Sequence, residues 1–315
     1  MLTLFSTAKA FAGHSGVIQR NALKSWTLLH PDVEVVLFGD DQGAAEVCSE
    51  FGLRHEPHVE RDESGLKRID YFFDRAQEIA QHDILCYVNC DIILTSDFCR
   101  AIEQVRAAHS RFLMVGRRWD TEIKQPIGFT NPGWAEETRQ RAIAENCQRD
   151  WWFIDYFAFS RGLYHRKLPP FVIGRVAWDN WLTWYAIDSG VPVVDASAVV
   201  LAIHQNHDYG YHPLGKQGVW NDELSQRNIQ HAGGWNHLWT IADATELLRP
   251  GGLRPNLRSR WRAFVRMWQS LVRMWQSLQF NVWQPIWFSV LDLTRPLRST
   301  LGLRREASRR SNEKI

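Results

Sequence analysis

The segment Asn89-Cys90-Asp91 has the clearest potential for chemistry in this sequence, because it directly follows a predicted strand, residues 83–88. A carboxylate at the end of a buried strand can hold a divalent cation, which stabilises negative charge on a departing group as a Lewis acid. A lone Asp in this place also suits a cap on the next turn. Asp91 is therefore a candidate metal ligand with a structural alternative.

A second cluster lies far along the chain, where His204, His207 and His212 follow the last long apolar run and Lys216 comes soon after. A neutral imidazole is a good ligand for cations such as Mn²⁺, and a Lys is a compact cation for phosphate oxygens. The same histidines also suit a solvated loop or one hydrogen-bonded core position. Together the two clusters favour a metal site shared by Asp91 and an imidazole.

Regularly alternating strands and helices must position these residues. The apolar patterns predict strands at residues 2–5, 33–38, 53–57, 83–88 and 112–116, helices at 15–30, 44–51 and 71–81, an aromatic block at 151–164, and further elements at 180–189 and 191–203. This alternation indicates an α/β fold whose mixed, mainly parallel sheet is flanked by helices. Ligands of such sheets lie beyond the carboxyl ends of the strands, which is where Thr7, Asp40 and Asp91 fall.

Composition divides the chain in two. Residues 249–315 contain 14 Lys and Arg against three acids, a net charge of +11, which leaves residues 1–248 at −9. We therefore expect an acidic globular domain over residues 1–248 and a basic tail over 249–315. The five scattered cysteines fit a reducing compartment, and no stretch has the ~18 consecutive apolar residues of a membrane span. A protein that is neither secreted nor integral to a membrane is expected.

The tail contains an exact tandem repeat, because residues 265–271 and 272–278 are the same seven residues, Val-Arg-Met-Trp-Gln-Ser-Leu. At about 100° per residue, the Trp, Val and Leu side chains share one face of a helix and the arginines take the other. Such a basic, Trp-rich amphipathic helix suits the interface of a bilayer, here over residues 257–280. Packing on the globular domain or on a second copy is the alternative, and no nucleic acid is expected.

The order of these features resembles that of the GT-A fold glycosyltransferases, particularly the retaining kinds, in which a DxD motif and a later His hold Mn²⁺ and a following Lys contacts the diphosphate. Over residues 1–235 the chain also looks like a group of uncharacterised bacterial nucleotide-diphospho-sugar transferases, through Thr3-Leu-Phe-Ser-Thr7, Gln19-Arg-Asn-Ala22 and Val88-Asn-Cys-Asp-Ile-Ile-Leu94. The resemblance implies a GT-A, Rossmann-like fold.

The resemblance also implies a metal site. Asp91 matches the last Asp of the DxD motif, and His204 or His207 matches the later ligand of Mn²⁺ or Mg²⁺. The sequence departs from the motif at Asn89, where the family has Asp. An amide can hydrogen-bond a ribose hydroxyl of the donor, but it adds no negative charge to the site. The departure puts the strength of metal binding in doubt.

Other positions match the donor-binding parts of that family. Thr7, with Asp40 or Asp41, falls in the nucleoside-binding loops, and Lys216 matches the phosphate contact. Arg68 is a further candidate partner of the diphosphate, as are Arg117 and Arg118, since a guanidinium forms a fork that fits phosphate oxygens. Surface ion pairs are the alternative role for these arginines.

Two acids lie among aromatic residues, as a sugar-binding site requires. Asp155 lies within the block Trp151–Phe157, and Asp179 lies between Trp178 and Asn180. Carboxylates bind sugar hydroxyls while aromatic faces pack on the ring, so both acids are candidate catalytic residues. Asp179 is the candidate for acceptor binding or general base. Alternatively, both acids are helix caps and the tryptophans are core.

The sequence thus predicts a glycosyltransferase that moves a sugar from a nucleotide-diphosphate donor to a polysaccharide or lipid-linked acceptor, with metal-assisted departure of the diphosphate. We expect it in the cytoplasm, peripheral on the inner face of the membrane. A non-catalytic carbohydrate- or nucleotide-sugar-binding scaffold of the same fold is the alternative. A sugar nucleotidyltransferase is a further one, although residues 6–13 carry a single glycine where that class has a Gly-rich basic loop.

Overall fold

The computed structural model describes residues 1–207, 219–262, 264–265, 268 and 271–272. The chain divides into two compact units, Met1–Arg260 and Trp261–Ile315. Lys216, one of the candidate donor-binding residues, and His212 lie outside the described residues. Among the described residues, no helix combines the length and the apolar character needed to span a bilayer.

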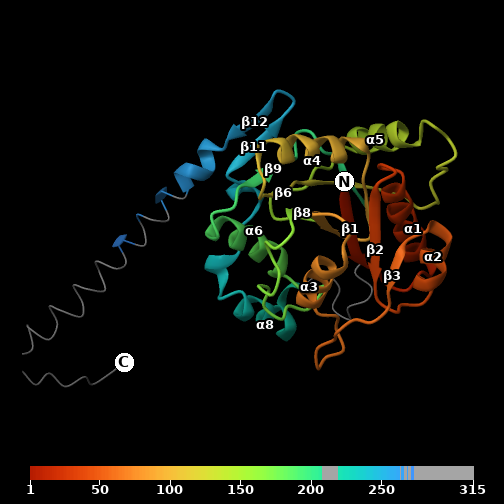
Figure 1. The fold of residues 1–315 in the computed structure, drawn as a ribbon, viewed down its shortest axis with the longest axis horizontal. Coiled ribbons are helices and arrows are strands. Elements are labelled where there is room, and N and C mark those ends of the chain that lie inside the picture. The colour runs from red at the N-terminus through yellow and green to blue at the C-terminus, as the bar shows by residue number, and fades with distance from the viewer. Residues whose placement is uncertain (208–218, 263, 266–267, 269–270, 273–315) are drawn as a thin grey trace, which may run out of the picture. The chain divides into compact units, whose positions relative to one another are not determined.

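The first unit is built on a large mixed sheet, which Figure 1 shows between its covering helices. Within the described residues the strand order is β12-β11-β9-β6-β8-β4-β1-β2-β3. The strands are β1 Leu2–Thr7, β2 Val33–Phe38, β3 Arg54–Glu56, β4 Ile84–Val88, β6 Leu113–Val115, β8 Tyr156–Ser160, β9 Val193–Asp195, β11 Glu246–Arg249 and β12 Gly252–Pro255. Neighbours pair in parallel except at β4-β8, β6-β8 and β11-β12. The predicted fold class, a mixed and mainly parallel sheet, is confirmed.

Helices cover both faces of this sheet. They are α1 Gly13–Thr27, α2 Ala44–Phe51, α3 Ile69–Ile79, α4 Ser96–Ala108, α5 Trp134–Glu145, α6 Trp178–Asp188 and α8 Glu223–His231, with short 3-10 helices η1 Trp235–His237 and η2 Ile241–Asp243. Successive strand side chains point to opposite faces. Leu4 of β1 therefore joins the core under α1, α2 and α4, whereas Phe5 joins an aromatic-rich core under α3, α6 and α8.

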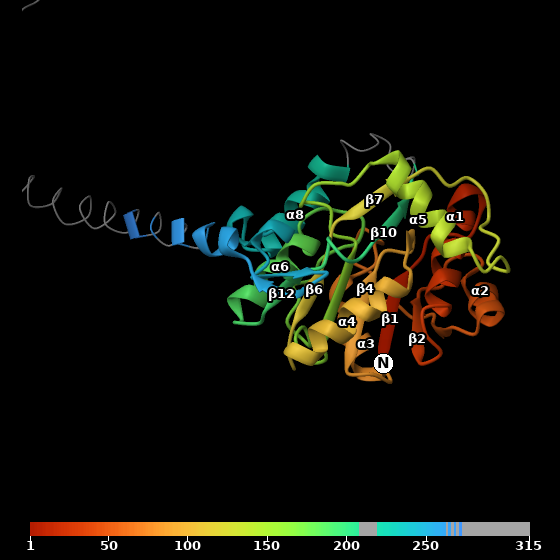
Figure 2. The ribbon, with the colours of Figure 1, turned by 90° about the horizontal axis from the view of Figure 1, so that it is seen from above.

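A small second sheet lies beside the large one, with the order β5-β10-β7. Its strands are β5 Ile92–Ile93, β7 Arg118–Thr121 and β10 Ala202–Gln205. Figure 2 shows β7 and β10 side by side, and they pair in parallel, whereas β10 and β5 pair antiparallel. In this register His204 lies opposite Asp120 on one side and Ile92 on the other. The second sheet therefore joins residues from three distant parts of the sequence.

The first unit extends past the domain boundary predicted at residue 248. Strand β12 follows that point and completes an antiparallel hairpin with β11, and β11 in turn pairs with β9 of the large sheet. The compact unit ends at Arg260. The change in charge along the sequence thus precedes the end of the first compact unit, because residues 249–260 are basic and still part of it.

Candidate active site

Asp91, His204 and His207 bring three ligand atoms together, all within 4.8 Å of one another. Oδ2 of Asp91 lies 3.1 Å from Nε2 of His207 and 3.7 Å from Nε2 of His204. Asp91 occupies the turn between β4 and β5, and His204 lies on β10. The pairing of β5 with β10 thus produces the convergence that the sequence predicted for residues separated by more than a hundred positions.

The chemistry of these side chains fits a divalent cation. Oδ1 of Asp91 is buried and accepts no hydrogen bond from any residue that the structure describes. Burial alone would raise the pKa of Asp91, but the imidazoles of His204 and His207 and the guanidinium of Arg118 outweigh burial and hold this pKa well below its usual range. The carboxyl group is therefore an anion with an unused buried oxygen beside two imidazoles, a donor set that suits Mn²⁺.

Asp120 lies beside one of these imidazoles, although Nδ1 of His204 makes no hydrogen bond within the described part of the chain. Its Oδ1 lies 3.2 Å from Nδ1 of His204, on the side of the ring away from Asp91. A carboxylate at Nδ1 favours the tautomer that leaves the Nε2 lone pair available to a metal. Burial would raise the pKa of Asp120, but His204, Arg118 and Arg149 together hold it at about 2. Arg118 and Arg149 contact its carboxylate at 2.9 and 2.6 Å. Sequence reasoning missed Asp120, whose only signal was its place after a predicted strand.

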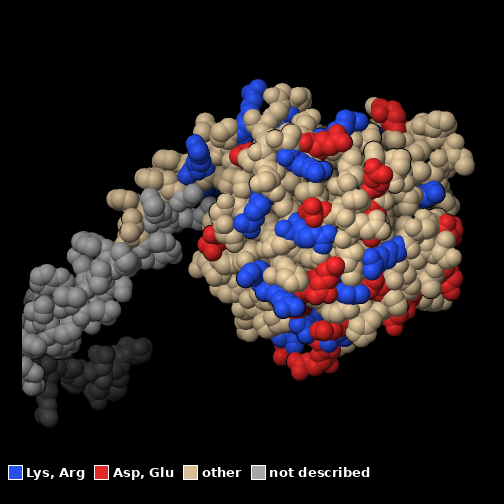
Figure 3. All heavy atoms as spheres, in the orientation of Figure 1, with Lys and Arg blue, Asp and Glu red and all other residues tan. Residues whose placement is uncertain are grey.

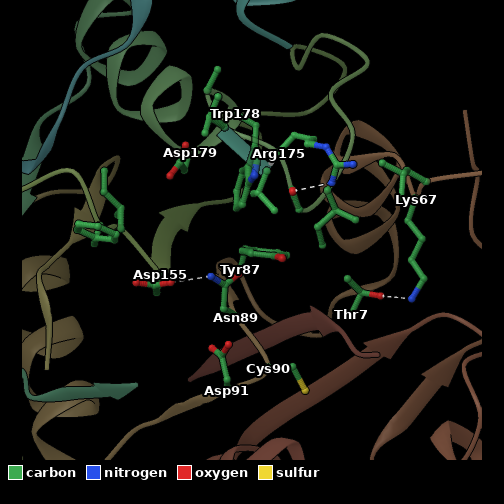
Figure 4. Close-up of a pocket in the computed structure, with 18 of the residues that line it drawn as sticks. Thr7, Lys67, Tyr87, Asn89, Cys90, Asp91, Asp155, Arg175, Trp178 and Asp179 are labelled. Carbon is green, nitrogen blue, oxygen red and sulfur yellow. Dashed lines mark hydrogen bonds between the residues drawn. The ribbon is translucent and has the colours of Figure 1, made fainter. Parts of the chain in front are cut away.

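Asp91 and His207 line a cavity of about 590 Å³ in the first unit, beyond the carboxyl ends of β1 and β4. His204 is not among the residues that line it, and it reaches the site through its proximity to Asp91. In the view of Figure 4, Thr7 lies at one side of the cavity and Asp179 at the other, and Asp91 lies below Asn89. This is the edge of a parallel sheet at which ligands of α/β proteins bind.

Thr7, Asp41 and Lys67 form a polar cluster at one side of the cavity. Nζ of Lys67 donates to Oγ1 of Thr7 and to the carbonyl of Ala8, both at 2.9 Å, and pairs with the carboxylate of Asp41. Burial lowers the pKa of Lys67, and the hydrogen bond to Asp41 opposes that effect. The structure thus brings together two of the predicted donor-binding residues through a lysine that sequence reasoning missed.

Two other predicted donor-binding residues lie outside this cluster. Arg68 forms ion pairs with Asp70 and Glu60, and Asp40 forms one with Arg61. Neither Arg68 nor Asp40 lines the cavity. For Arg68, the direction of the side chain follows from the local backbone. Residues 67 and 68 form successive bridges, and side chains alternate in extended chain, so Lys67 faces the cavity and Arg68 faces away.

Asn89 donates a hydrogen bond to a buried carboxylate. Its Nδ2 donates to Oδ1 of Asp155 at 2.7 Å, and Nη1 of Arg118 contacts the same carboxylate at 3.0 and 3.1 Å. Asp155 is thus buried and accepts hydrogen bonds from two side chains. A carboxylate at position 89 would face Asp155 with like charge, which gives a physical reason for the amide at this position.

Asp179 lines the opposite side of the cavity, in the first turn of α6. Burial raises its pKa to about 7, and the charge of Asp155 adds to the effect. The preceding Ala177 has φ +88°, a conformation that residues with a Cβ rarely adopt. Strained backbone of this kind often occurs at functional sites. A carboxyl group with this pKa can accept or donate a proton near neutral pH.

No protein-family model and no curated protein matches the chain. Among solved structures, it is similar to glucosyl-3-phosphoglycerate synthase from Mycobacterium tuberculosis. The complex of that enzyme with Mg²⁺ and uridine diphosphate is 15% identical with a TM-score of 0.44, and the match covers 74% of this chain and 80% of that chain. The complex with Mn²⁺, uridine-diphosphate-glucose and phosphoglyceric acid is 15% identical with a TM-score of 0.45 and the same coverage.

The raised pKa of Asp179 predicts that this residue destabilises the fold at high pH. Between the unfolded value of 3.8 and the folded value of about 7, the folded chain holds a proton that the unfolded chain releases, so stability falls as pH rises through this window. We predict that Asp179→Asn raises the free energy of unfolding at about pH 8 by up to roughly 4 kcal/mol, and by less than half of that at about pH 5. Urea unfolding at both pH values measures the difference.

The exposed Asp188 at the other end of α6 provides the control for this measurement. Asp188→Asn is expected to change stability by a similar small amount at both pH values. An Asp179→Asn protein whose stability relative to the wild type is the same at both pH values contradicts the assignment of a raised pKa to Asp179.

Proposed function

We propose that this chain is a glycosyltransferase of the GT-A type, which transfers a sugar from a nucleotide-diphosphate donor to a polysaccharide or lipid-linked acceptor. One observation carries the proposal. Asp91, His204 and His207 converge at a cavity beyond the carboxyl ends of the central strands. These residues would hold Mn²⁺ or Mg²⁺ beside the diphosphate of the donor. A bound divalent cation supplies Lewis-acid stabilisation of the charge that develops on the departing diphosphate.

The cluster of Thr7, Asp41 and Lys67 is the proposed nucleoside end of the donor site. It offers a hydroxyl, a carboxylate and an ammonium group at the wall of the cavity, all of which can hydrogen-bond a ribose or a base. The ion pair between Lys67 and Asp41 keeps both groups in place before the donor binds. Asn89, whose Nδ2 donates to Asp155, also lines the cavity and is a further proposed contact of the donor.

The other side of the cavity is the proposed sugar and acceptor end. We propose that Asp179 contacts the acceptor hydroxyl, because its raised pKa allows it to take up a proton near neutral pH. Asp155 has its oxygens occupied by Arg118 and Asn89. Its proposed contribution to catalysis is therefore to position these two residues beside Asp91.

Donor hydrolysis in the presence and absence of Mn²⁺ tests this proposal. Uridine-, guanosine-, adenosine- and thymidine-diphosphate sugars form the donor panel, and release of the nucleoside diphosphate is measured. The wild-type chain is expected to hydrolyse at least one donor in a metal-dependent way. Asp91→Ala is expected to lower the rate by about 100-fold or more, because the stabilisation of the leaving group is lost.

The control for this test is Asp32→Ala, which removes a carboxylate that is 72% exposed and lies outside the cavity. Its rate is expected to equal that of the wild type. Full activity of Asp91→Ala would contradict the proposal. Tight binding of a nucleotide sugar by calorimetry, without turnover under any condition, would instead support the scaffold alternative.

We also propose that residues 257–280, most of which belong to the second unit, attach the protein to the inner face of a membrane. Among the described residues of the second unit, four large apolar side chains at helical spacing are exposed, namely Trp261, Phe264, Trp268 and Leu271. Lys and Arg are interspersed with Asp and Glu on the face of the first unit shown in Figure 3, whereas the excess of basic residues lies in the sequence after residue 248. Exposed indoles beside arginines favour the interface of an anionic bilayer.

Sedimentation of the full chain with phosphatidylcholine vesicles, with and without phosphatidylglycerol, tests this attachment. Binding is expected with the anionic vesicles and is expected to weaken with added salt. The double variant Trp261→Ala, Trp268→Ala is expected to bind about 10-fold more weakly, since it loses two buried aromatic contacts with the interface. Leu28→Ala, which alters an exposed residue of the first unit, is the control. A dimer that forms through these tryptophans without vesicles would contradict the proposal.

A further inference from the structure

Exposed tryptophans surround the catalytic cavity. Trp152, Trp220 and Trp235 all line it, and they are 48%, 41% and 67% exposed. Large aromatic side chains are normally buried to a much greater extent, and a group of exposed ones marks a binding surface. None of the roles proposed above for metal, nucleoside or diphosphate uses these three side chains.

The three indoles come from separate segments of the first unit. Trp152 lies in the loop before β8, Trp220 lies shortly before α8, and Trp235 begins η1. Backbone hydrogen bonds tie the segment before β8 to η2 and the segment after η1 to α6. The amide of Ile241 donates to the carbonyl of Trp151, and the amide of Trp239 donates to the carbonyl of Asn180. Three independent elements therefore place indoles around the cavity that Asp179 also lines.

Polar side chains are interleaved with these indoles. Asp179, Asn221 and Gln226 line the same region, and Arg175 does so while its Nε donates to Oδ2 of Asp222 at 2.5 Å. A neutral sugar presents apolar C–H faces and hydroxyl groups, which match indoles and amides or carboxylates respectively. A phosphorylated or carboxylated acceptor needs unpaired cations in the site that binds it. Asp222 already neutralises the charge of Arg175. A lipid tail would favour an unbroken apolar wall.

We infer that the acceptor is a neutral glycan chain whose sugar rings pack on Trp152, Trp220 and Trp235, with the reacting hydroxyl at Asp179. An oligosaccharide fits this site better than one monosaccharide, because a single pyranose ring has two faces and cannot cover three indoles. This inference rests on the proposed glycosyltransferase function. It adds the class of acceptor and the residues that select it.

Direct binding tests the inference without donor or metal. Calorimetry and tryptophan fluorescence are recorded with neutral hexasaccharides of the malto-, cello- and manno- series and the corresponding monosaccharide, with a sugar phosphate, and with a short-chain alkyl glycoside as the lipid-like probe. We expect at least one hexasaccharide to bind, and to bind more tightly than the monosaccharide, the sugar phosphate or the alkyl glycoside. Trp152→Ala and Trp235→Ala are each expected to raise its Kd about 10-fold.

Two further variants sharpen this test. Trp151→Ala removes a neighbouring tryptophan that is 39% exposed but does not line the cavity, and it is expected to leave the Kd unchanged. Trp235→Phe keeps an aromatic face and is expected to restore part of the affinity, which separates loss of stacking from loss of folding. Equal Kd values for the wild type and for both Trp152→Ala and Trp235→Ala would overturn the inference, as would preference for the sugar phosphate or the alkyl glycoside.

The failures of the two proposals are distinguishable. Donor hydrolysis by the wild type, combined with no binding of any hexasaccharide, would overturn the glycan inference and leave the transferase function standing. Binding of a hexasaccharide that depends on Trp152 and Trp235, combined with no hydrolysis of any donor, would support the glycan site and contradict the transferase function.

Discussion

The pairing of β10 between β5 and β7 is the constraint on which the whole site depends. The large sheet supplies a cavity at the ends of β1 and β4, but it does not by itself bring a histidine to Asp91. The short second sheet does so, because its register sets His204 opposite Asp120 and next to the turn that contains Asp91. Gln205, which is fully buried, reinforces this register through hydrogen bonds to the carbonyls of Ile18 and Asp91.

Charge balance explains how so many acids are tolerated around one cavity. Burying an unpaired carboxylate is costly, so each one must have a partner or take up a proton. Asp120 and Asp155 are paired with arginines, and Asp91 faces two imidazoles. Asp179 has no such partner among the described residues, and its pKa is raised instead. Asp41, which also lines the cavity, is paired with Lys67. The site therefore combines three compensated acids, one acid open to a cation and one acid open to a proton.

The sequence was sufficient to predict the alternating strands and helices, and with them the cavity edge where Thr7 and Asp91 lie. It was also sufficient to predict that Asp91 lies close to His204 and His207, since the segment with Asp91 and the segment with the histidines each follow an apolar run. It was insufficient in loops, where the direction of each side chain decides which residue lines the cavity. Lys67 rather than its neighbour Arg68 enters the cavity, and Asp41 rather than Asp40 lines it. Sequence patterns also do not reveal which acid is paired, as for Asp155, and which is left to take up a proton.

Diffraction from crystals soaked in MnCl₂, recorded at the manganese absorption edge, shows directly whether Asp91, His204 and His207 bind one cation. We expect an anomalous peak within about 2.5 Å of Oδ of Asp91 and of Nε2 of both His204 and His207. The peak is expected to disappear in Asp91→Ala crystals soaked in the same way. An anomalous peak elsewhere in the cavity, or wild-type crystals without any peak at these three residues, would show that they do not form a metal site.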